Sequence, residues 1–597
     1  MRQTSWLFSF IILAWATSAA AQSPVNTNDG MIAPNDDFNL EDKEVEPTPE
    51  EPKTKEKPKK EPALSLADWE RTDWALVKPE KALVEVTGYF RARSGTFRKL
   101  NFGNNGYTEQ DGDAGRRYPL NDGGNANTSY TDMRLRIMPK MNISDNISVM
   151  MTFDVMDNLV LGSTPTNFPD KGGPIETLST GQLTGNRASR DPRDMLVAKH
   201  AYVRMTALNE QLELRVGRMP DHWGMGMLYN SGMCIDCDFD RSVDRAAVSF
   251  RLAGHTIALM FDWVGTGPSF YPFGADGPGV DGVIWNDAQE YGLRVHKEDH
   301  PDDIREKVLQ GKTVLNYGMH NGIRVQKSGV SGDPVAVGTD VTKLPTEAQK
   351  ESRDALLYTG DGYLKLHHRN FQLGIEAAIQ VGSFKDKIYD VNLDPQKTKI
   401  LMYGFALESK YTFTGVAKGT LLSFKSGMAS GDKAPGFGAL SRQSNQRYAG
   451  GDSSINNFQF SPNYTVGLDM LVYRRIIGTV TDTFYIRPAV SYDFNEDFSG
   501  EIAMLYSQAV YGASTPSCTA ANTGDSVART GCKTPMALEF DAEVSYGLAK
   551  TYFAGKTQRL RASLVGALAV PFGAFTDTAG KSPSLAWMIQ GRMFVTF

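Results

Sequence analysis

The sequence predicts an all-β protein, a closed antiparallel β-barrel of about 18 strands (16 to 20 accepted) that crosses a lipid bilayer. Three observations predict this fold. Segments that alternate between polar and apolar residues recur from residue 82 to the C-terminus. Very short links alternate with long polar links between those segments. The chain begins with an export signal, and beyond it no apolar run reaches the roughly 20 residues that a spanning helix needs.

Residues 1–21 have the pattern of a secretory signal peptide. Arg2 supplies the positive start, an apolar stretch runs from Trp6 to Trp15, and Ala19-Ala20-Ala21 offers a small-residue cleavage site. The apolar stretch is about ten residues long, which is half of what a membrane-spanning helix requires. We therefore expect the mature chain to be exported from the cytoplasm.

Residues 22–80 form a linker in this prediction. Within it, the tract 41–62 (EDKEVEPTPEEPKTKEKPKKEP) consists mostly of Glu, Lys, Pro and Thr. Such a segment cannot bury enough apolar surface to offset the entropy lost on ordering, so we expect it to be disordered. It would lie in the periplasm, where it could be a solvated spacer or could contact peptidoglycan.

The overall composition agrees with a barrel. Mean hydropathy is −0.34 and aromatic residues make up 10% of the chain; a barrel has such a polar average because each strand shows lipid only every second residue. The formal net charge of −6 over 597 residues argues against nucleic acid as a partner. Residues 81–597 contain strands and turns with no linker, so we expect one domain there.

The strands are predicted from their period of two. In 585–597, Trp587, Ile589 and Phe597 share an apolar face, while the opposite face is mostly polar. The same alternation occurs in 82–93, 132–140, 200–207, 314–326 and 538–548. Charged residues avoid the apolar face, where each would cost roughly 2–4 kcal/mol at the bilayer midplane.

The last residue, Phe597, adds a clue to location. A terminal Phe on an alternating strand resembles the C-terminal signature that the outer-membrane assembly machinery recognises in bacterial β-barrels. This resemblance implies the outer membrane of a Gram-negative cell, with the barrel assembly machinery as a partner. Outer-membrane lipid and lipopolysaccharide would then surround the barrel, and three copies could form a homotrimer.

Link lengths predict the topology. Short links fall at 142–145, 209–210, 253–254 and 369–370, and long polar links at 95–128, 158–194, 265–286, 327–353 and 429–462. Short periplasmic turns and long extracellular loops are typical of outer-membrane barrels. About 19 candidate strands can be counted, but single-chain bacterial barrels have an even number. The surplus candidate lies in 463–494 or in the loop before it.

The densest motif is GRMPDHWGMGMLYNSGMCIDCDFDRSVDR at 217–245. Its pattern GRMxxHWGxGxLYNxG resembles a signature of a family of large, porin-like outer-membrane proteins whose function is uncharacterised. The resemblance implies the fold and the location and supplies no reaction. His222 and Trp223 could face a ligand or could pack the loop.

Four aspartates in this motif suggest a metal site. Asp236, Asp238, Asp240 and Asp244 stand at relative positions 1, 3, 5 and 9, the offsets of oxygen ligands in a calcium-binding loop. Two features disagree with that loop: Arg241 occupies the position of the required Gly, and Ala247 that of the bidentate Glu. A different Ca²⁺ geometry stays open; the alternative is that the acids pair with neighbouring arginines. No other cofactor is expected.

The four cysteines form two local pairs. Cys518 and Cys532 would close a loop of about 15 residues, worth about 3 kcal/mol if bridged, and an oxidising compartment favours that disulfide. Cys234 and Cys237 form a C-x-x-C without the βαβ context of a redox site. We expect a bridge there too.

The alternation directs many charged side chains into the lumen. Rings of arginine favour anions, so an Arg-lined pore with a weak anion preference is expected, unless the charges pair and fill the interior. The predicted pore-lining residues are Arg91, Arg93, Arg134, Arg136, Arg204, Arg215, Arg294, Arg324, Arg487, Glu539, Asp541 and Glu543.

Three functions are therefore considered. The first is a porin-like channel for passive diffusion of small hydrophilic solutes or ions, since about 16 to 18 strands leave an aqueous lumen unless something plugs it. The second is a plugged barrel that acts as a surface or structural anchor, with loop 158–194 as a candidate plug. The third is an enzyme, which we do not expect because the sequence has no phosphate-binding loop, no G-x-S-x-G elbow and no H-E-x-x-H pair.

Overall fold

The computed structural model describes residues 83–103, 127–161, 196–264, 288–330, 350–386, 396–433, 437, 454–495, 497–523, 526–552, 556–576 and 580–597. The predicted signal peptide, the linker with its tract 41–62, and all but the first residues of loop 158–194 lie outside this part of the chain. No helix in the described residues is long and apolar enough to cross a membrane.

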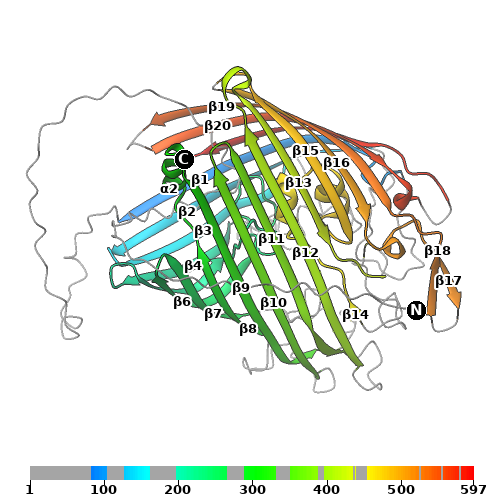
Figure 1. Ribbon diagram of the computed structural model, residues 1–597, viewed down its shortest axis with the longest axis horizontal. Helices are drawn as coiled ribbons and strands as arrows, with labels where there is room; N and C mark the ends of the chain where they lie inside the picture. The colour runs from blue at the N-terminus through cyan, green and yellow to red at the C-terminus, as the bar shows by residue number, and fades with distance from the viewer. Residues whose placement is uncertain are drawn as a thin grey trace, which may run out of the picture.

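A closed antiparallel β-barrel of 18 strands forms the body of the protein, which confirms the predicted fold class and strand number. Each barrel strand pairs with the next one along the chain, and β1 (Val84–Arg98) pairs with β21 (Ala586–Thr596) to close the ring. Arg93 lies opposite Arg592 in this closing pair. Figure 1 shows the strands running side by side at a steep tilt.

The other sixteen barrel strands are β2 (Asn127–Ser144), β3 (Ile147–Val160), β4 (Leu196–Ala207), β5 (Leu212–Pro220), β6 (Ser242–Leu252), β7 (His255–Trp263), β8 (Gln289–Lys297), β9 (Thr313–Val330), β10 (Lys350–His368), β11 (Phe371–Asp386), β12 (Gln396–Thr412), β13 (Thr420–Ala429), β15 (Thr483–Asp493), β16 (Phe498–Ala509), β19 (Pro535–Tyr552) and β20 (Lys556–Pro571).

The remaining elements mark the two ends of the barrel. At one end lie α2 (Pro301–Leu309), the link between β12 and β13, and the C-terminus. At the other end, the hairpin of β17 (Thr519–Thr523) and β18 (Ser526–Thr530) projects from the barrel (Figure 1). The two-residue β14 (Ser454–Ile455) pairs in parallel with β12. Further short helices are η6 (Gly415–Ala417), η7 (Pro462–Gly467), η8 (Val472–Ile477), η9 (Gly512–Ser514) and η10 (Gly573–Phe575).

The five alternating segments and the C-terminal run are strands, with the predicted faces. Arg91 and Arg134 are fully buried inside the barrel, whereas Leu564 and Ile589 expose more than half of their surface on the outside. Such an apolar exterior suits hydrocarbon rather than water.

Aromatic side chains gather near both ends of the outer face. Near the short turns, the rings of Tyr411 and Phe413 lie 5.1 Å apart. Toward the long loops, Phe261 lies 4.7 Å from Trp263 and 5.4 Å from Tyr291. Two aromatic girdles are typical of barrels at the two membrane interfaces.

The alternation of short and long links is also confirmed. Short turns join β2 to β3, β4 to β5, β6 to β7 and β10 to β11, at or next to the predicted positions. The surplus strand candidate in 463–494 is resolved: only 483–493 is a strand, and the residues before it form η7 and η8. They are apolar because they are buried inside the barrel, not because they face lipid.

Candidate functional site

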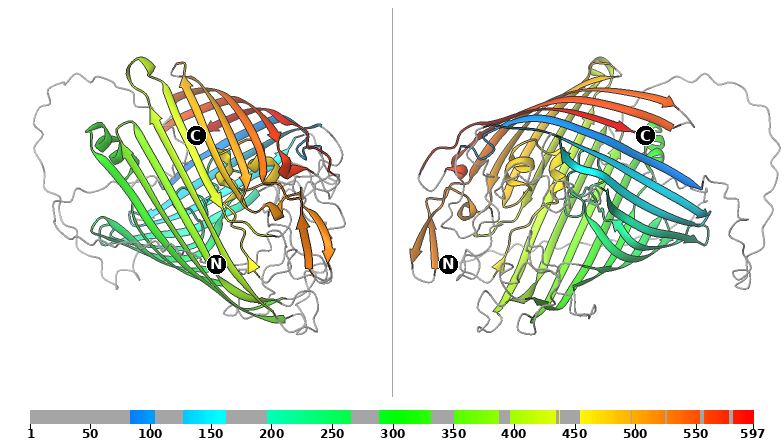
Figure 2. Two further views of the ribbon diagram at one scale, coloured as in Figure 1. Left: turned by 45° about the vertical axis from the view of Figure 1, so that its right-hand side comes forward. Right: turned by 180° about the vertical axis from the view of Figure 1, so that it is seen from behind.

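Two of the long connections fold into the barrel instead of projecting from it. We call residues 221–241, between β5 and β6, the first inserted loop, and residues 456–482, before β15, the second inserted loop. Figure 2 shows the short helices of the second loop, in gold, inside the ring of strands. Together the two loops determine how much of the lumen is open to solutes.

The first inserted loop is held on one side by arginines of β1 and β2. Arg91 donates to the carbonyl oxygens of Ile235 and Cys237, each at 3.0 Å. Arg134 donates to the carbonyl of Cys237 at 2.7 Å, and Arg136 to that of Gly232 at 3.1 Å. Because the side chains of a strand alternate between faces, these arginines all point inward and reach one chain segment.

Carboxylates complete this contact. Arg93 lies 3.0 Å from Asp236 and 2.7 Å from Asp238. Asp236 is also 2.8 Å from Arg474 of the second inserted loop and 3.3 Å from Arg592 of β21. Burial alone would raise the pKa of Asp236, but the surrounding guanidinium groups hold it well below its usual range.

A wall carboxylate on the far side holds the other end of the first inserted loop. Glu376 of β11 accepts hydrogen bonds from the backbone N–H groups of Met225, Met227 and Leu228. Gly224 makes this approach possible: its φ is +58°, and an added Cβ would lie 2.5 Å from the Glu376 carboxylate. The loop therefore crosses the lumen from β1 to β11.

Aromatic packing fixes the same end of the loop. Trp223 is 5% exposed, its ring meets Tyr363 edge-on at 5.1 Å, and the Arg294 guanidinium lies 5.1 Å from its centroid. Between the two alternatives left by the sequence, the arrangement of Trp223 is that of loop packing. Asp221, where the loop begins, pairs with Arg245 at 2.9 Å and with Arg294 at 2.8 Å.

The second inserted loop is fixed by a similar device. Glu539 of β19 accepts from three consecutive N–H groups, those of Met470, Leu471 and Val472, at 3.0, 2.8 and 2.8 Å. The donors stand at the start of the π-helical turn η8, where backbone N–H groups lack partners within the turn. A buried wall carboxylate thus takes the place of a capping residue.

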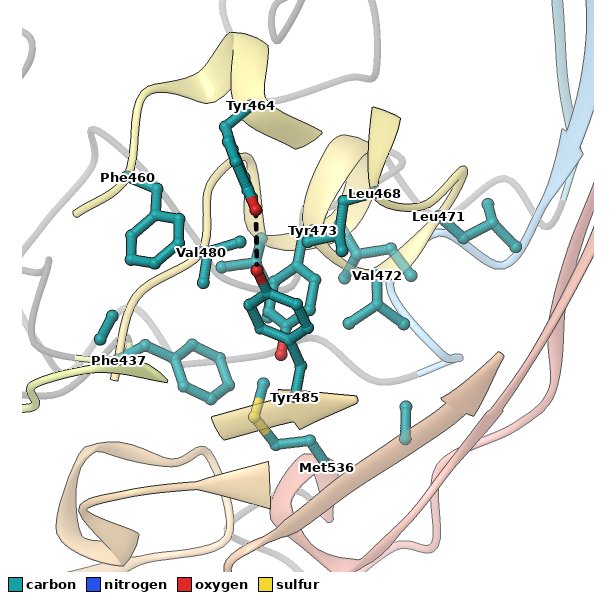
Figure 3. Packing of buried hydrophobic residues seen from close by; sticks show 14 of the residues in the cluster. Phe437, Phe460, Tyr464, Leu468, Leu471, Val472, Tyr473, Val480, Tyr485 and Met536 are labelled. Carbon is teal, nitrogen blue, oxygen red and sulfur yellow. Dashed lines mark hydrogen bonds between the residues drawn. The ribbon is translucent and has the colours of Figure 1, made fainter. Parts of the chain in front are cut away.

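Hydrophobic packing adds to this attachment. Figure 3 shows Tyr464, Tyr473 and Val480 of the loop packed over Tyr485 of β15 and Met536 of β19, with the Tyr485 hydroxyl 3.2 Å from that of Tyr464. All five side chains belong to one cluster of buried residues. The loop is therefore a folded part of the barrel interior.

The two inserted loops are also joined to each other. The Asn463 side chain accepts from the Phe239 N–H at 3.2 Å and donates to the Phe239 carbonyl at 2.9 Å. The Ser461 N–H donates to the Met227 carbonyl at 2.7 Å. They form one partition across the lumen.

The predicted pore-lining arginines point inward and are all ion-paired, and so is Arg592 of β21. The pairs are Arg91 and Arg93 with Asp238, Arg134 with Asp157, Arg136 with Asp154, Arg204 and Arg215 with Glu213, Arg294 with Asp221, Arg324 with Glu290, Arg487 with Glu501, and Arg592 with Asp236.

This pairing corrects part of the pore-lining prediction. Arg91, Arg93, Arg134 and Arg136 are at most 1% exposed, so they hold the first inserted loop and do not line an open path. Glu539 and Asp541 are buried too, and Glu539 holds the second loop. Alternation predicts which face a side chain takes, but not what occupies the space in front of it.

A second group of inward charges does meet solvent, toward the end with the short turns. The exposed side-chain fractions are 40% for Arg215, 37% for Glu501 and 29% for Lys365. Glu543 is 21% exposed and lies 3.1 Å from Arg561, itself 49% exposed. These side chains are accessible to solvent and carry both signs of charge, and we call this end of the lumen the vestibule.

The four aspartates of the predicted calcium loop do not converge. Asp236 and Asp238 face the arginines of β1, Asp240 lies 3.5 Å from Lys199, and Asp244 pairs with Arg218 on the outer face at 2.7 Å. No group of three His, Cys, Asp or Glu side chains in the described residues could hold a metal ion. The predicted calcium geometry is not formed, because Asp236, Asp238 and Asp240 precede β6 and contact cations inside the barrel, whereas Asp244 lies within β6 and pairs with Arg218 on the outer face.

Both predicted cysteine pairs are bonded, Cys234 with Cys237 and Cys518 with Cys532. The first disulfide closes the tip of the first inserted loop. The backbone carbonyl of Cys237 also accepts hydrogen bonds from Arg91 and Arg134. The second lies at the base of the β17–β18 hairpin.

Among the arginine partners that were not predicted, three lie on β2 and β3. Asp132 shares the inward face of β2 with Arg134, so alternation could have identified it. Asp154 could have been found in the same way on β3. Asp157 could not: the register of β3 against β2 shifts between Met133 and Leu135, and this bulge places Asp157 where a regular strand would turn it outward.

No protein-family model and no curated protein matches the chain. Among solved structures, OccK1 (OpdK) of Pseudomonas aeruginosa is similar with 12% identity and a TM-score of 0.40, over 86% of this chain and 98% of that one. OccK11 (OpdR) of P. aeruginosa has 9% identity and a TM-score of 0.38, over 86% and 95%. A BenF-like porin from P. fluorescens Pf-5 has 10% identity and a TM-score of 0.39, over 86% and 98%. These structures are only distantly similar to this chain, and the barrel assignment rests on the strand pairing of this chain.

Proposed function

We propose that the protein is an outer-membrane, porin-like channel for passive diffusion of small hydrophilic solutes or ions, narrowed by its two inserted loops. The observation that carries this proposal is the combination of an apolar outer face with a charged, solvent-accessible vestibule inside the same ring of strands. A barrel of about 18 strands is wide enough for an aqueous lumen. The proposal includes no catalytic step.

The outer-membrane location is part of this proposal and is supported by the barrel surface and by two sequence patterns. The signal pattern of residues 1–21 and the terminal Phe597 favour export and outer-membrane assembly. The short turns would face the periplasm and the long loops the outside. The linker 22–80 would then lie in the periplasm. Barrel assembly machinery, surrounding lipopolysaccharide, peptidoglycan contact by 41–62 and a homotrimer remain the partners that we propose.

The ion pairs change the selectivity expected of this channel. Rings of unpaired arginine would favour anions, but each inward arginine discussed above has a carboxylate partner, so the fields largely cancel. We infer a channel that selects mainly by size, with at most a slight anion preference from the partly exposed Arg215 and Lys365.

The alternative function is a plugged barrel that acts as a surface or structural anchor. The partition favours it, because buried hydrogen-bonded ion pairs make an inserted segment costly to release. Under this alternative the hairpin β17–β18 and the periplasmic tract 41–62 would carry the activity.

Liposome swelling distinguishes the two functions. Vesicles that contain the full-length protein are diluted into iso-osmotic solutions of neutral and charged solutes of graded size. The channel predicts uptake of the smallest solutes, whatever their charge, with a sharp decrease as size increases. Folded protein that admits none of them would refute the channel and support the anchor.

A further inference from the structure

A cluster of lysines lies on the outer face of the barrel, near the end with the long loops. Lys385 of β11 stands directly opposite Lys397 of β12, and Lys399 is the diagonal neighbour, opposite Ser383. Lys397 and Lys399 share the outward face of β12 with Leu401 and are exposed. Lys327 extends the group onto the outward face of β9.

This cluster carries an excess of positive charge. Within the cluster, Lys385 forms an ion pair with Asp354. Lys397 and Lys399 form no ion pair with any of the described residues. Like charges directly opposite each other in an antiparallel sheet repel. An anion placed between the ammonium groups would remove that repulsion, and a phosphate matches a lysine well as a point-charge partner.

The surface beside the lysines is apolar. Val381 of β11 and Leu401 of β12 come next along these strands toward the short-turn end, followed by Ile379 and Tyr403; each exposes between 41% and 48% of its surface. Basic side chains above an apolar column match a lipid whose phosphorylated headgroup lies above its acyl chains. A free phosphate ion would contact only the lysines and leave the apolar column uncovered.

The outward patch of β5 and β6 differs from this cluster. At the same end of the barrel, Arg218 of β5 pairs with Asp244 of β6 at 2.7 Å, so that patch is neutral.

We propose that the lysine cluster binds the phosphorylated headgroup of a glycolipid in the outer leaflet, with the acyl chains of that lipid against β11 and β12. This inference rests on the outer-membrane location included in the proposed function. It does not depend on whether the lumen conducts.

Binding to defined lipids tests the proposal. The full-length protein in detergent is titrated with diphosphoryl lipid A and, separately, with the same lipid after removal of its phosphates, and bound lipid is counted by native mass spectrometry. The wild type is expected to bind the phosphorylated form about tenfold more tightly. The variant K397Q/K399Q, which keeps the Lys385–Asp354 pair, is expected to lose that preference.

The matched control is K312Q/K418Q, which removes two exposed lysines at the opposite end of the barrel. It should bind like the wild type. Equal binding by K397Q/K399Q, or equal binding of both lipids by the wild type, would overturn the proposal. Competition by inorganic phosphate at the concentration of the lipid would do so as well, because the apolar column would then add nothing. Liposome swelling of the same variants reports separately on solute uptake. A failure of the glycolipid-binding proposal can therefore be distinguished from a failure of the proposed channel function.

Discussion

The substitution Asp236→Asn tests the attachment of the first inserted loop most sharply. Asp236 lies 2.8 to 3.3 Å from Arg93, Arg474 and Arg592, whose side chains are at most 5% exposed. Removing one partner of a buried ion pair costs about 3–5 kcal/mol because the remaining charge is left without compensation. Since Asn keeps an acceptor oxygen, we expect the lower end, about 3 kcal/mol.

That free energy changes the balance between the inserted and the released loop. Each 1.4 kcal/mol is about a tenfold change in an equilibrium constant, so the released state gains roughly 100-fold. In planar bilayers the variant should therefore show larger and more frequent open states than the wild type. The matched control is Asp244→Asn, which breaks the exposed pair with Arg218 and should cost at most about 1 kcal/mol. A folded Asp236→Asn protein with wild-type conductance would show that Asp236 does not keep the first inserted loop in the lumen.

Three further substitutions test the other contacts. Glu539→Ala leaves three buried N–H groups without an acceptor, and each is expected to cost about 1–3 kcal/mol. Limited proteolysis, with the products identified by mass spectrometry, should therefore find new cleavage within 456–482. Unchanged protection of this segment would contradict the capping role of Glu539. Gly224→Ala places a Cβ 2.5 Å from a carboxylate oxygen of β11, whereas a Cβ at Gly254, also at positive φ, meets nothing within 4 Å; only the first should raise conductance. Cys518→Ser/Cys532→Ser should lower the free energy of unfolding of the hairpin region by about 3 kcal/mol without changing conductance, and altered conductance would show that the hairpin reaches the lumen.

The barrel could be predicted from the sequence because its signal is local. The alternation within each strand indicates which side faces lipid. Charged residues rarely interrupt this pattern, because a charge on the lipid face costs free energy at the bilayer midplane. Ile589 and Arg592 illustrate this: Ile589 is exposed on the outer face of β21 and Arg592 is buried on the inner face, as predicted.

The partition could not be predicted, because its contacts join residues far apart in sequence. Arg91 and Asp238 are 147 residues apart, and Arg474 and Asp236 are 238 apart. Alternation placed Arg91 inside, but no local pattern distinguishes a water-facing arginine from one that binds an inserted loop. For the same reason the apolar stretch before Thr483 resembled a strand. Loop 158–194, the predicted candidate plug, lies largely outside the described residues; within the described residues, 221–241 and 456–482 enter the lumen.

Single-channel conductance of the full-length wild type, in a planar bilayer with a salt gradient, distinguishes a narrowed channel from a closed barrel and from an open pore. We expect a small, steady conductance, well below that of an unobstructed barrel of this strand number, and a reversal potential close to zero. Folded protein that stays silent would contradict the channel. A wide-open conductance with strong anion selectivity would contradict the partition and the pairing of the arginines.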